Sequence, residues 1–161
     1  MHKIPVSVLV VIYTLDMQVL LLERADHPGY WQSVTGSCDP GESLRQTAVR
    51  EVREETGLDA EKYVLTDWNL QFEFEIFEEW RHRYAPGVTR NTEHVFGLEL
   101  PQSLPVILEP REHLNFQWLP CGEAEKKVFS WTNAAALEKL SAKMSKSDYG
   151  LYLRHILTTP H

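Results

Sequence analysis

The stretch that most constrains this chain is GSCDPGESLRQTAVREVREETGL, at residues 36–58. Its apolar residues recur every four positions, which is the spacing of one face of an amphipathic helix. They are Leu44, Ala48 and Val52. Either Glu42 or Ser43 suits the start of that helix, and Gly57 suits its end. The stretch therefore predicts an amphipathic helix between these residues.

Acidic side chains crowd the same predicted helix. Glu51 and Glu55 stand one helical turn apart and Glu54 lies one step around, so the three carboxylates share an arc of roughly 100°. Like charges at this spacing destabilise an isolated helix by roughly a few tenths of a kcal/mol per pair. Hard divalent cations, which prefer oxygen ligands, would offset that repulsion. The alternative is a solvated acidic face, so other features of the sequence have to decide between the two.

Composition limits the kinds of protein that this chain can be. A length of 161 residues fits one domain, and 43% hydrophobic with 24% charged residues is ordinary for a globular protein. The net charge of −7 argues against general nucleic-acid binding, because that binding rests on neutralising phosphates with Lys and Arg. Cys38 and Cys121 make no disulfide framework, and we find neither a signal peptide nor an apolar stretch of roughly 18 residues. We therefore expect a cytoplasmic protein.

Hydrophobic patterns indicate strands on both sides of the acidic helix. The expected strands cover residues 6–13, 19–22, 31–35, 63–77, 80–84, 93–100 and 116–119. Further helical patterns cover residues 123–129 and 133–144. This order predicts a single α/β domain over residues 1–144, followed by a tail at residues 145–161 that either docks on the domain or frays.

Read as a pattern, residues 36–58 are G-x5-E-x7-R-E-V-x-E-E-x-G-L. This pattern resembles the signature of the Nudix hydrolases at every fixed position. The resemblance implies an α/β/α sandwich with a mixed, curved sheet between helices. It also implies Mg²⁺-dependent hydrolysis, with Mn²⁺ as an alternative ion, of a nucleoside diphosphate linked to another group. We expect such an enzyme to be a monomer that acts on a small-molecule triphosphate, with no nucleic acid or membrane as partner.

Residue types in the motif suit this chemistry. Hydrolysis at phosphorus requires the charge on the phosphate oxygens to be neutralised, and Mg²⁺ does this while lowering the pKa of the attacking water. The expected metal ligands, in order of preference, are Glu51, Glu55 and Glu54. Gly36 would let its backbone carbonyl approach the metal. The resemblance implies that Arg50 orients a glutamate and that Glu42 braces the junction of loop and helix through that arginine.

The segment FEFEIFEEWRHRYAPGVTRNTEH, at residues 72–94, concentrates basic side chains in an otherwise acidic protein. They are Arg81, His82, Arg83 and Arg90. Arginine matches phosphate oxygens bidentately, so the segment is suited to binding phosphates. A solvated strand with a basic hairpin explains it equally well, and chemistry alone leaves both interpretations open.

Several short segments support a narrower resemblance. WQSVTGS, FEIF, RHRYAPGVTRNTE, REHL and SWTN look like those of the bacterial dihydroneopterin triphosphate pyrophosphohydrolases of folate synthesis, over about residues 3–133. This resemblance implies substrate contacts at Lys3, Arg24, Thr35, Phe74, Glu75, Ile76, Phe77 and Ser130. The cations can meet phosphates, the phenylalanines can stack on a flat ring, and Glu75 can accept hydrogen bonds from a pterin. Each also has an ordinary structural explanation, such as a surface ion pair for Arg24 or a core position for Phe74.

Glu112 lies in the loop before the last expected strand. The resemblance implies a further metal ligand there, which can also serve as the base that activates water. The base is then either Glu51 or Glu112, and the sequence does not choose which phosphorus is attacked. His82 and His113 are candidate acid–base groups by residue type, whereas Cys38 has no visible base beside it, which argues against a nucleophilic role.

The two resemblances together imply a Mg²⁺-dependent hydrolase that cleaves dihydroneopterin triphosphate to the monophosphate and pyrophosphate. The alternative within the same class is a broader (d)NTP pyrophosphohydrolase that cleans the nucleotide pool, because guanine and pterin share a hydrogen-bonding edge. A third hypothesis, from another class, is an inactive module that only binds a ligand or a protein. Such a module would be expected to lose a motif glutamate, and this chain keeps them all.

Overall fold

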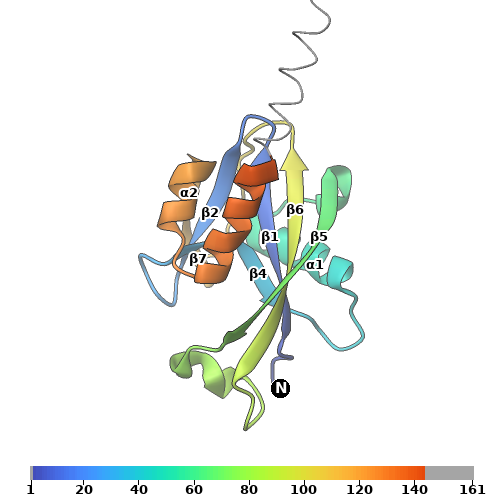
Figure 1. Ribbon diagram of the computed structural model, residues 1–161, viewed down its shortest axis with the longest axis vertical. Helices are drawn as coiled ribbons and strands as arrows, with labels where there is room; N and C mark the ends of the chain where they lie inside the picture. The colour runs from blue at the N-terminus through green and yellow to red at the C-terminus, as the bar shows by residue number, and fades with distance from the viewer. Residues whose placement is uncertain (1, 144–161) are drawn as a thin grey trace, which may run out of the picture.

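The computed structural model describes residues 2–143, and Figure 1 shows how they are arranged. The described residues form a sheet of seven strands, which are β1 (Val6–Thr14), β2 (Gln18–Arg24), β3 (Trp31–Gln32), β4 (Val34–Ser37), β5 (Val64–Glu75), β6 (Arg90–Leu100) and β7 (His113–Pro120). The helices are α1 (Leu44–Thr56), α2 (Cys121–Lys127) and the 3₁₀ helices η1 (Ala60–Lys62) and η2 (Glu78–Arg83). Residues 131–143 are also helical.

The sheet is mixed, and β1 lies at its centre. β1 runs parallel to β6 along its whole length, whereas the other neighbouring strands are antiparallel. β1 and β2 pair at Tyr13 and Val19, next to their turn. Farther from the turn β1 pairs with β4 and β2 pairs with β3, so the sheet divides between these two pairs of strands. β7 pairs with β2 along the whole length of β2. The candidate site is built from residues on both sides of this division.

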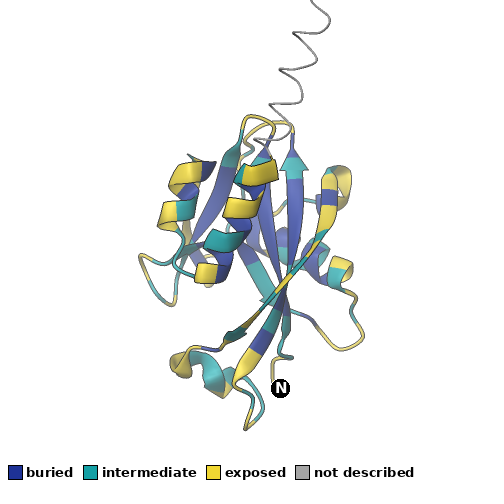
Figure 2. Ribbon diagram, in the orientation of Figure 1, coloured by how far each residue is buried: buried dark blue, intermediate teal, exposed yellow. Residues whose placement is uncertain are grey.

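Helices cover both faces of the sheet, which confirms the predicted α/β/α class (Figure 1). On one face the side chains of Val8 and Val10 pack with Val52 of α1. On the other face, Leu9 and Val11 pack with α2 and with the helical residues 131–143. Because successive side chains of a strand point to opposite faces, a strand covered on both sides is apolar throughout. The central strands are accordingly the buried ones in Figure 2.

The acidic helix has the ends that its sequence predicts. Ser43 is the N-cap: its side chain accepts a hydrogen bond from the Gln46 backbone N–H, and the Gln46 side chain accepts one from the Ser43 N–H. Gly57 ends the helix with φ of 75°, a left-handed conformation that glycine adopts without a steric cost. Of the two candidate caps, Ser43 takes this role and Glu42 is left to bind Arg50.

Some boundaries differ from those predicted. Residues 80–84 were expected in a strand, which is wrong, because η2 covers Glu78–Arg83. The Trp80 N–H donates to the Phe77 carbonyl and the two rings stack with centroids 5.1 Å apart, so a tight turn replaces the strand. The predicted tail at residues 145–161 lies outside the described residues.

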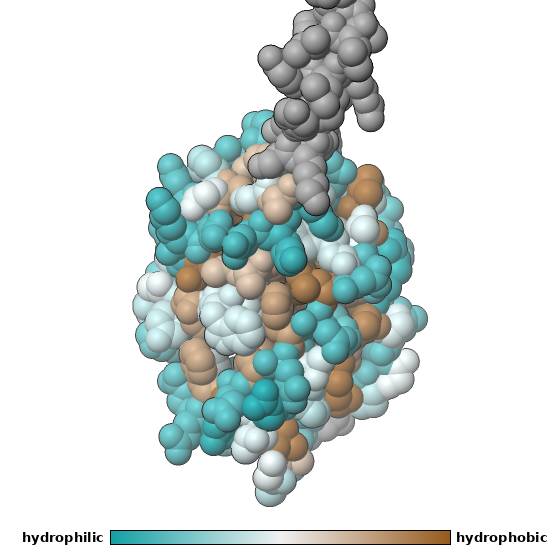
Figure 3. Space-filling view, viewed as in Figure 1, coloured by the Kyte–Doolittle hydropathy of each residue, from teal (hydrophilic) through white to brown (hydrophobic). Residues whose placement is uncertain are grey.

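The surface of residues 2–143 exposes several large hydrophobic side chains, among them Ile107 and Trp131. On the face drawn in Figure 3, hydrophilic and apolar side chains are interspersed, as on ordinary globular surfaces. No helix within residues 2–143 is long and apolar enough to cross a membrane.

Candidate active site

A cavity of about 640 Å³ opens where the sheet divides. Its lining joins residues from α1, from β4 and from the start of β7 with residues of β1, β5 and β6. The predicted site residues that line it are Lys3, Arg24, Thr35, Gly36, Glu51, Glu55, Phe74, Glu75, Ile76, Phe77, Glu112 and Ser130. Residues that are far apart in the sequence therefore meet around one cavity.

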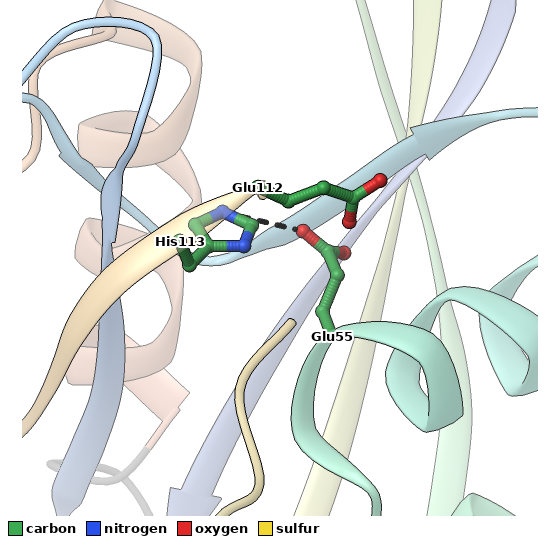
Figure 4. A group of neighbouring side chains, drawn as sticks. All are labelled: Glu55, Glu112 and His113. Atoms are coloured by element: carbon green, nitrogen blue, oxygen red, sulfur yellow. Dashed lines mark ion pairs between the residues drawn. The ribbon is translucent and has the colours of Figure 1, made fainter. Parts of the chain in front are cut away.

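Two carboxylates and one imidazole converge at one end of this cavity (Figure 4). Glu55, Glu112 and His113 each present one possible ligand atom, and these atoms lie within 4.8 Å of one another. The Glu55 side chain is buried, with 2% of its residue surface exposed. Its Oε2 accepts a hydrogen bond from the Thr35 backbone N–H at 3.2 Å, and its Oε1 lies 3.4 Å from His113 Nε2. The strand β4 and the start of β7 thereby fix the Glu55 carboxylate from two sides.

Arg50 holds the neighbouring carboxylates in place. Its Nε and Nη2 donate to the two oxygens of Glu42 at 2.8 and 2.9 Å, and Nη1 donates to Glu51 at 2.8 Å. Nη2 also donates to the Ser37 backbone carbonyl at 3.0 Å, which ties α1 to β4. These bonds hold the pKa of Glu42 down to about 2, mainly through the hydrogen bond from Arg50. Glu42 therefore braces the junction of loop and helix, as predicted.

Gly36 makes room for the Glu51 carboxylate. A Cβ atom at this position would overlap the Cδ, Oε1 and Oε2 atoms of Glu51. Gly36 belongs to β4 and its φ is not positive, so glycine is required here by the close approach of a side chain and not by backbone conformation. The lack of a side chain at Gly36 thus allows the Glu51 carboxylate to lie against β4.

Burial, together with repulsion between neighbouring carboxylates, raises the pKa values of Glu51 and Glu55. Burial is the main cause that raises the pKa of Glu51 to about 7, with contributions from Glu54 and Glu112 against the lowering effect of Arg50. Burial also raises the pKa of Glu55 well above its ordinary value, followed by the charges of Glu51 and Glu112. Oxygen donors that repel one another in a buried place fit a divalent cation, which would stabilise their charged forms. Glu51, Glu55 and Glu112, with the carbonyl of Gly36, are the residues that would hold it.

His113 differs from these acids because it stays neutral. Burial, and then the charge of Arg24, lower its pKa to about 4. A neutral imidazole can orient Glu55 through its N–H group or donate an electron pair from its other nitrogen.

Cationic side chains face the same cavity. Arg24 donates to both Asp26 oxygens and to Gln32 Oε1, and its guanidinium lies 4.4 Å from the centroid of Trp80. Lys3 is exposed, and partial desolvation of its ammonium group, followed by the charge of Arg83, lowers its pKa. Arginine groups anchored in this way present fixed charge to an anion.

Several predicted residues have positions that narrow their roles. Ile76 is buried, whereas Phe77 is 42% exposed and stacks on Trp80. The Thr35 hydroxyl already donates to the Val8 carbonyl, so its backbone N–H is the group that serves the site. Ser130 accepts a hydrogen bond from the Asn133 N–H at the start of the helical residues 131–143.

Other predicted residues lie outside this cavity. The lining formed by residues 2–143 leaves out Arg50 and Glu54, and the Glu54 side chain is 50% exposed beside Arg50. It also leaves out Arg81, His82 and Arg90 of the basic segment at residues 81–90, whereas Arg83 and its neighbour Tyr84 line the cavity. Arg90 pairs with Glu73 at 3.0 Å, and Arg81 donates to the Ile76 carbonyl. The interpretation as an ordinary basic hairpin therefore holds for much of that segment.

Comparison with known proteins agrees with this geometry. The model of the NUDIX domain matches residues 3–140. The chain belongs to the NUDIX family. NUDIX hydrolases use divalent metal ions, and the acidic cluster at Glu55, Glu112 and His113 gives this chain a place for one.

Relatives within the NUDIX family include two curated enzymes. The chain is 50% identical over 141 residues to the dihydroneopterin triphosphate diphosphatase of Escherichia coli K12, covering 86% of this chain and 93% of that one. It is 43% identical over 136 residues to the dihydroneopterin triphosphate diphosphatase of Haemophilus influenzae, covering 83% and 85%. A solved structure of the E. coli dihydroneopterin triphosphate pyrophosphohydrolase superposes with a TM-score of 0.81 and covers 86% of this chain and 95% of that chain.

The NUDIX cavity also contains polar residues that the sequence analysis missed. They are Ser7, Gln32, Asn91, Glu93, Thr132 and Asn133, all of them buried. One signal in the sequence points to two of them. Asn91 and Glu93 alternate in step with Val95, so they occupy a buried face of β6 where apolar residues are the rule.

Proposed function

We propose that this NUDIX protein hydrolyses dihydroneopterin triphosphate to dihydroneopterin monophosphate and pyrophosphate, with Mg²⁺ as its cofactor and residues 1–144 as one catalytic domain. One observation carries the proposal: every substrate contact that the narrower resemblance implies lies in the cavity that also contains the acidic cluster. Half of the aligned residues are identical to an enzyme whose name states this activity, which supports the same assignment.

The acidic end of the cavity suits hydrolysis at phosphorus. Bound Mg²⁺ supplies neutralisation of phosphate charge and a lower pKa for water. Glu51, Glu55 and Glu112 would hold the ion, and Arg50 keeps Glu51 in position through the 2.8 Å hydrogen bond. Water adds its oxygen to phosphorus and gives up a proton to a carboxylate, either Glu51 or Glu112. The electrons of the broken P–O bond go to the leaving group, which is pyrophosphate for attack at the α-phosphorus and dihydroneopterin monophosphate for attack at the β-phosphorus.

The remainder of the cavity suits the rest of the substrate. Lys3, Arg24 and Arg83 offer positive charge to a triphosphate that the net charge of −7 would otherwise repel. Phe74 and Phe77 offer flat apolar surface to a pterin ring. Both ends of one substrate molecule therefore find complementary side chains.

A substrate panel tests this proposal. We expect kcat/KM for dihydroneopterin triphosphate to exceed kcat/KM for dATP and for dGTP, and we expect EDTA to abolish the activity. Folded E55Q serves as the inactive control, because an amide replaces a buried carboxylate of the acidic cluster. A preference for the nucleotides would contradict the pterin assignment and favour the broader (d)NTP pyrophosphohydrolase instead.

A further inference from the structure

A second group of buried polar side chains lies in the cavity, separate from the acidic cluster. Glu93 is 5% exposed, and its Oε1 has no hydrogen-bond partner among residues 2–143. Asn91, two residues earlier on the same face of β6, is 4% exposed, and its Oδ1 also has no partner among the described residues. A buried acceptor without a donor costs about 1–3 kcal/mol, so two of them at the wall of one cavity indicate donors that arrive with a ligand.

A hydrogen bond fixes the orientation of Asn91. Its Nδ2 group donates to the Ser7 hydroxyl at 2.8 Å, which leaves Oδ1 as the free group. The Thr132 side chain lies near Glu93 and lowers the pKa of its carboxyl group, while Glu93 Oε1 has no partner among residues 2–143. Two buried acceptors on one face of β6 are thus available to donors from the cavity.

Aromatic side chains surround these acceptors. In the pairing of β5 with β6, Phe72 lies opposite Glu93 and Phe74 lies opposite Asn91. Phe72 packs edge-on against Trp131 at 5.5 Å, and Trp131 lines the cavity with 61% of its surface exposed. Flat apolar walls around buried acceptors are suited to a flat heterocycle that carries N–H groups on one edge.

The distance to the acidic cluster suits a substrate with a ring and phosphates. Glu93 pairs in register with Ser7 of β1, and Ser7 pairs with Ser37 of β4, which follows Gly36. Neighbouring strands lie about 4.8 Å apart, so Glu93 stands about 10 Å across the sheet from the strand that borders Glu51. One elongated molecule can therefore reach both places at once.

We infer that Glu93, assisted by Asn91, determines the ring specificity of the enzyme by accepting hydrogen bonds from the amino group and the adjacent ring N–H of a 2-amino-4-oxo pyrimidine ring. This inference rests on the proposed function and deepens it. Two adjacent N–H groups on one edge match the two acceptors that lack a partner among residues 2–143, Glu93 Oε1 and Asn91 Oδ1. Adenine and the pyrimidine bases lack that pair of donors, and hypoxanthine lacks the amino group.

Glu93 is better placed for this role than Glu75. Both residues line the cavity, but Glu75 is exposed, so water competes for its oxygens. Burial makes each hydrogen bond to Glu93 more selective, because an analogue that lacks the donor leaves a buried acceptor unpaired. Burial also raises the pKa of Glu93 to about 7, and donors from a ligand would stabilise its charged form.

Kinetics with E93Q test the inference. The amide keeps the shape of the side chain but turns an NH₂ group toward the substrate donors. We expect KM for dihydroneopterin triphosphate to rise at least about 10-fold in E93Q, while kcat changes less than about 3-fold, since ring binding is uniform between ground and transition states. E123Q, which changes an exposed carboxylate of α2 outside the cavity lining of residues 2–143, is the control and should leave both constants within about 3-fold.

A second measurement compares dGTP with dITP, and its main result comes from the wild type. The wild type should prefer dGTP over dITP by at least about 10-fold in kcat/KM, because dITP lacks the amino donor, and E93Q should reduce this ratio below about 3. Equal kcat/KM of the wild type for dGTP and dITP would overturn the inference even if E93Q fails to fold. Wild-type turnover of dihydroneopterin triphosphate with unchanged constants in folded E93Q would overturn it and leave the proposed function intact. A wild type that turns over no triphosphate would overturn the proposed function and the inference with it.

Discussion

Replacement of Gly36 by alanine offers the sharpest test of the geometry around the motif helix. The added methyl group would overlap three atoms of the Glu51 carboxylate. Nonbonded heavy atoms lie about 3.5–4.0 Å apart, so the carboxylate has to retreat by at least about 1 Å. A misplacement of that size in a reacting centre costs about 100-fold in rate, which corresponds to about 2.7 kcal/mol of transition-state stabilisation. We therefore expect kcat of G36A to fall by about 100-fold or more.

The fold should survive this change. Gly36 lies in β4 with an extended backbone that alanine also adopts, so the unfolding midpoint should stay within a few degrees of the wild type. G122A is the matched control: Gly122 lies in α2, and a Cβ there has nothing within 4 Å. Steady-state pyrophosphate release and thermal unfolding of the two variants give the comparison. A folded G36A protein that keeps more than about a tenth of the wild-type kcat would refute the view that Glu51 must sit against Gly36.

Three further predictions concern the carboxylates. Saturation with Mg²⁺ at 100-fold above its Kd should stabilise the wild type by about 2.7 kcal/mol, or roughly 5–10 °C in Tm. In a thermal melt, E55Q should lose most of this increase in Tm. An equal increase in E55Q would contradict the assignment of Glu55 as a metal ligand. The pKa of Glu42 is about 2 when folded against 4.5 as its ordinary value, so the unfolded state binds more protons between these values and stability must fall as the pH drops through that window. Urea midpoints measured from pH 5 to pH 2 should decline less steeply in E42Q than in the wild type, and equal slopes would exclude this contribution. Glu54 is half-exposed and lies outside the cavity lining of residues 2–143. E54Q should therefore reduce kcat by less than about 10-fold, whereas E51Q should reduce kcat by orders of magnitude. A larger loss of kcat in E54Q than in E51Q would make Glu54 the more important residue.

Local sequence patterns predicted the helix and the sheet well. The caps at Ser43 and Gly57 follow from residue types that fit only a few backbone conformations, and the alternation of β1 between two apolar faces follows from its cover of helices. The turn of η2 was missed; besides the local stacking of Phe77 on Trp80, both rings pack against Phe129, which is distant in sequence. Short-range patterns cannot contain such a contact.

For the candidate site as well, the sequence predicted contacts between residues that are close in the chain and missed contacts between distant ones. The motif residues are close in sequence, so their spacing alone placed Glu51 and Glu55 together on α1. The roles that we infer for Glu93 and Asn91 depend on their burial, and that of Asn91 also depends on its hydrogen bond to Ser7. Sequence alone does not predict this burial, because an acidic residue in a strand pattern is usually exposed. Glu75 and Glu93 both lie in segments that resemble the same family, so the resemblance did not show which of the two carboxylates is buried. Only the three-dimensional arrangement separates an exposed carboxylate from a buried one.

Product analysis tests the central claim most directly. Wild-type protein, dihydroneopterin triphosphate and Mg²⁺ should give one pyrophosphate for each dihydroneopterin monophosphate, as followed by ³¹P NMR. The reaction should stop with EDTA and should be at least about 100-fold slower with E55Q. Release of inorganic phosphate in place of pyrophosphate, or activity that persists in EDTA, would contradict the account of the acidic cluster as the metal site of a pyrophosphohydrolase.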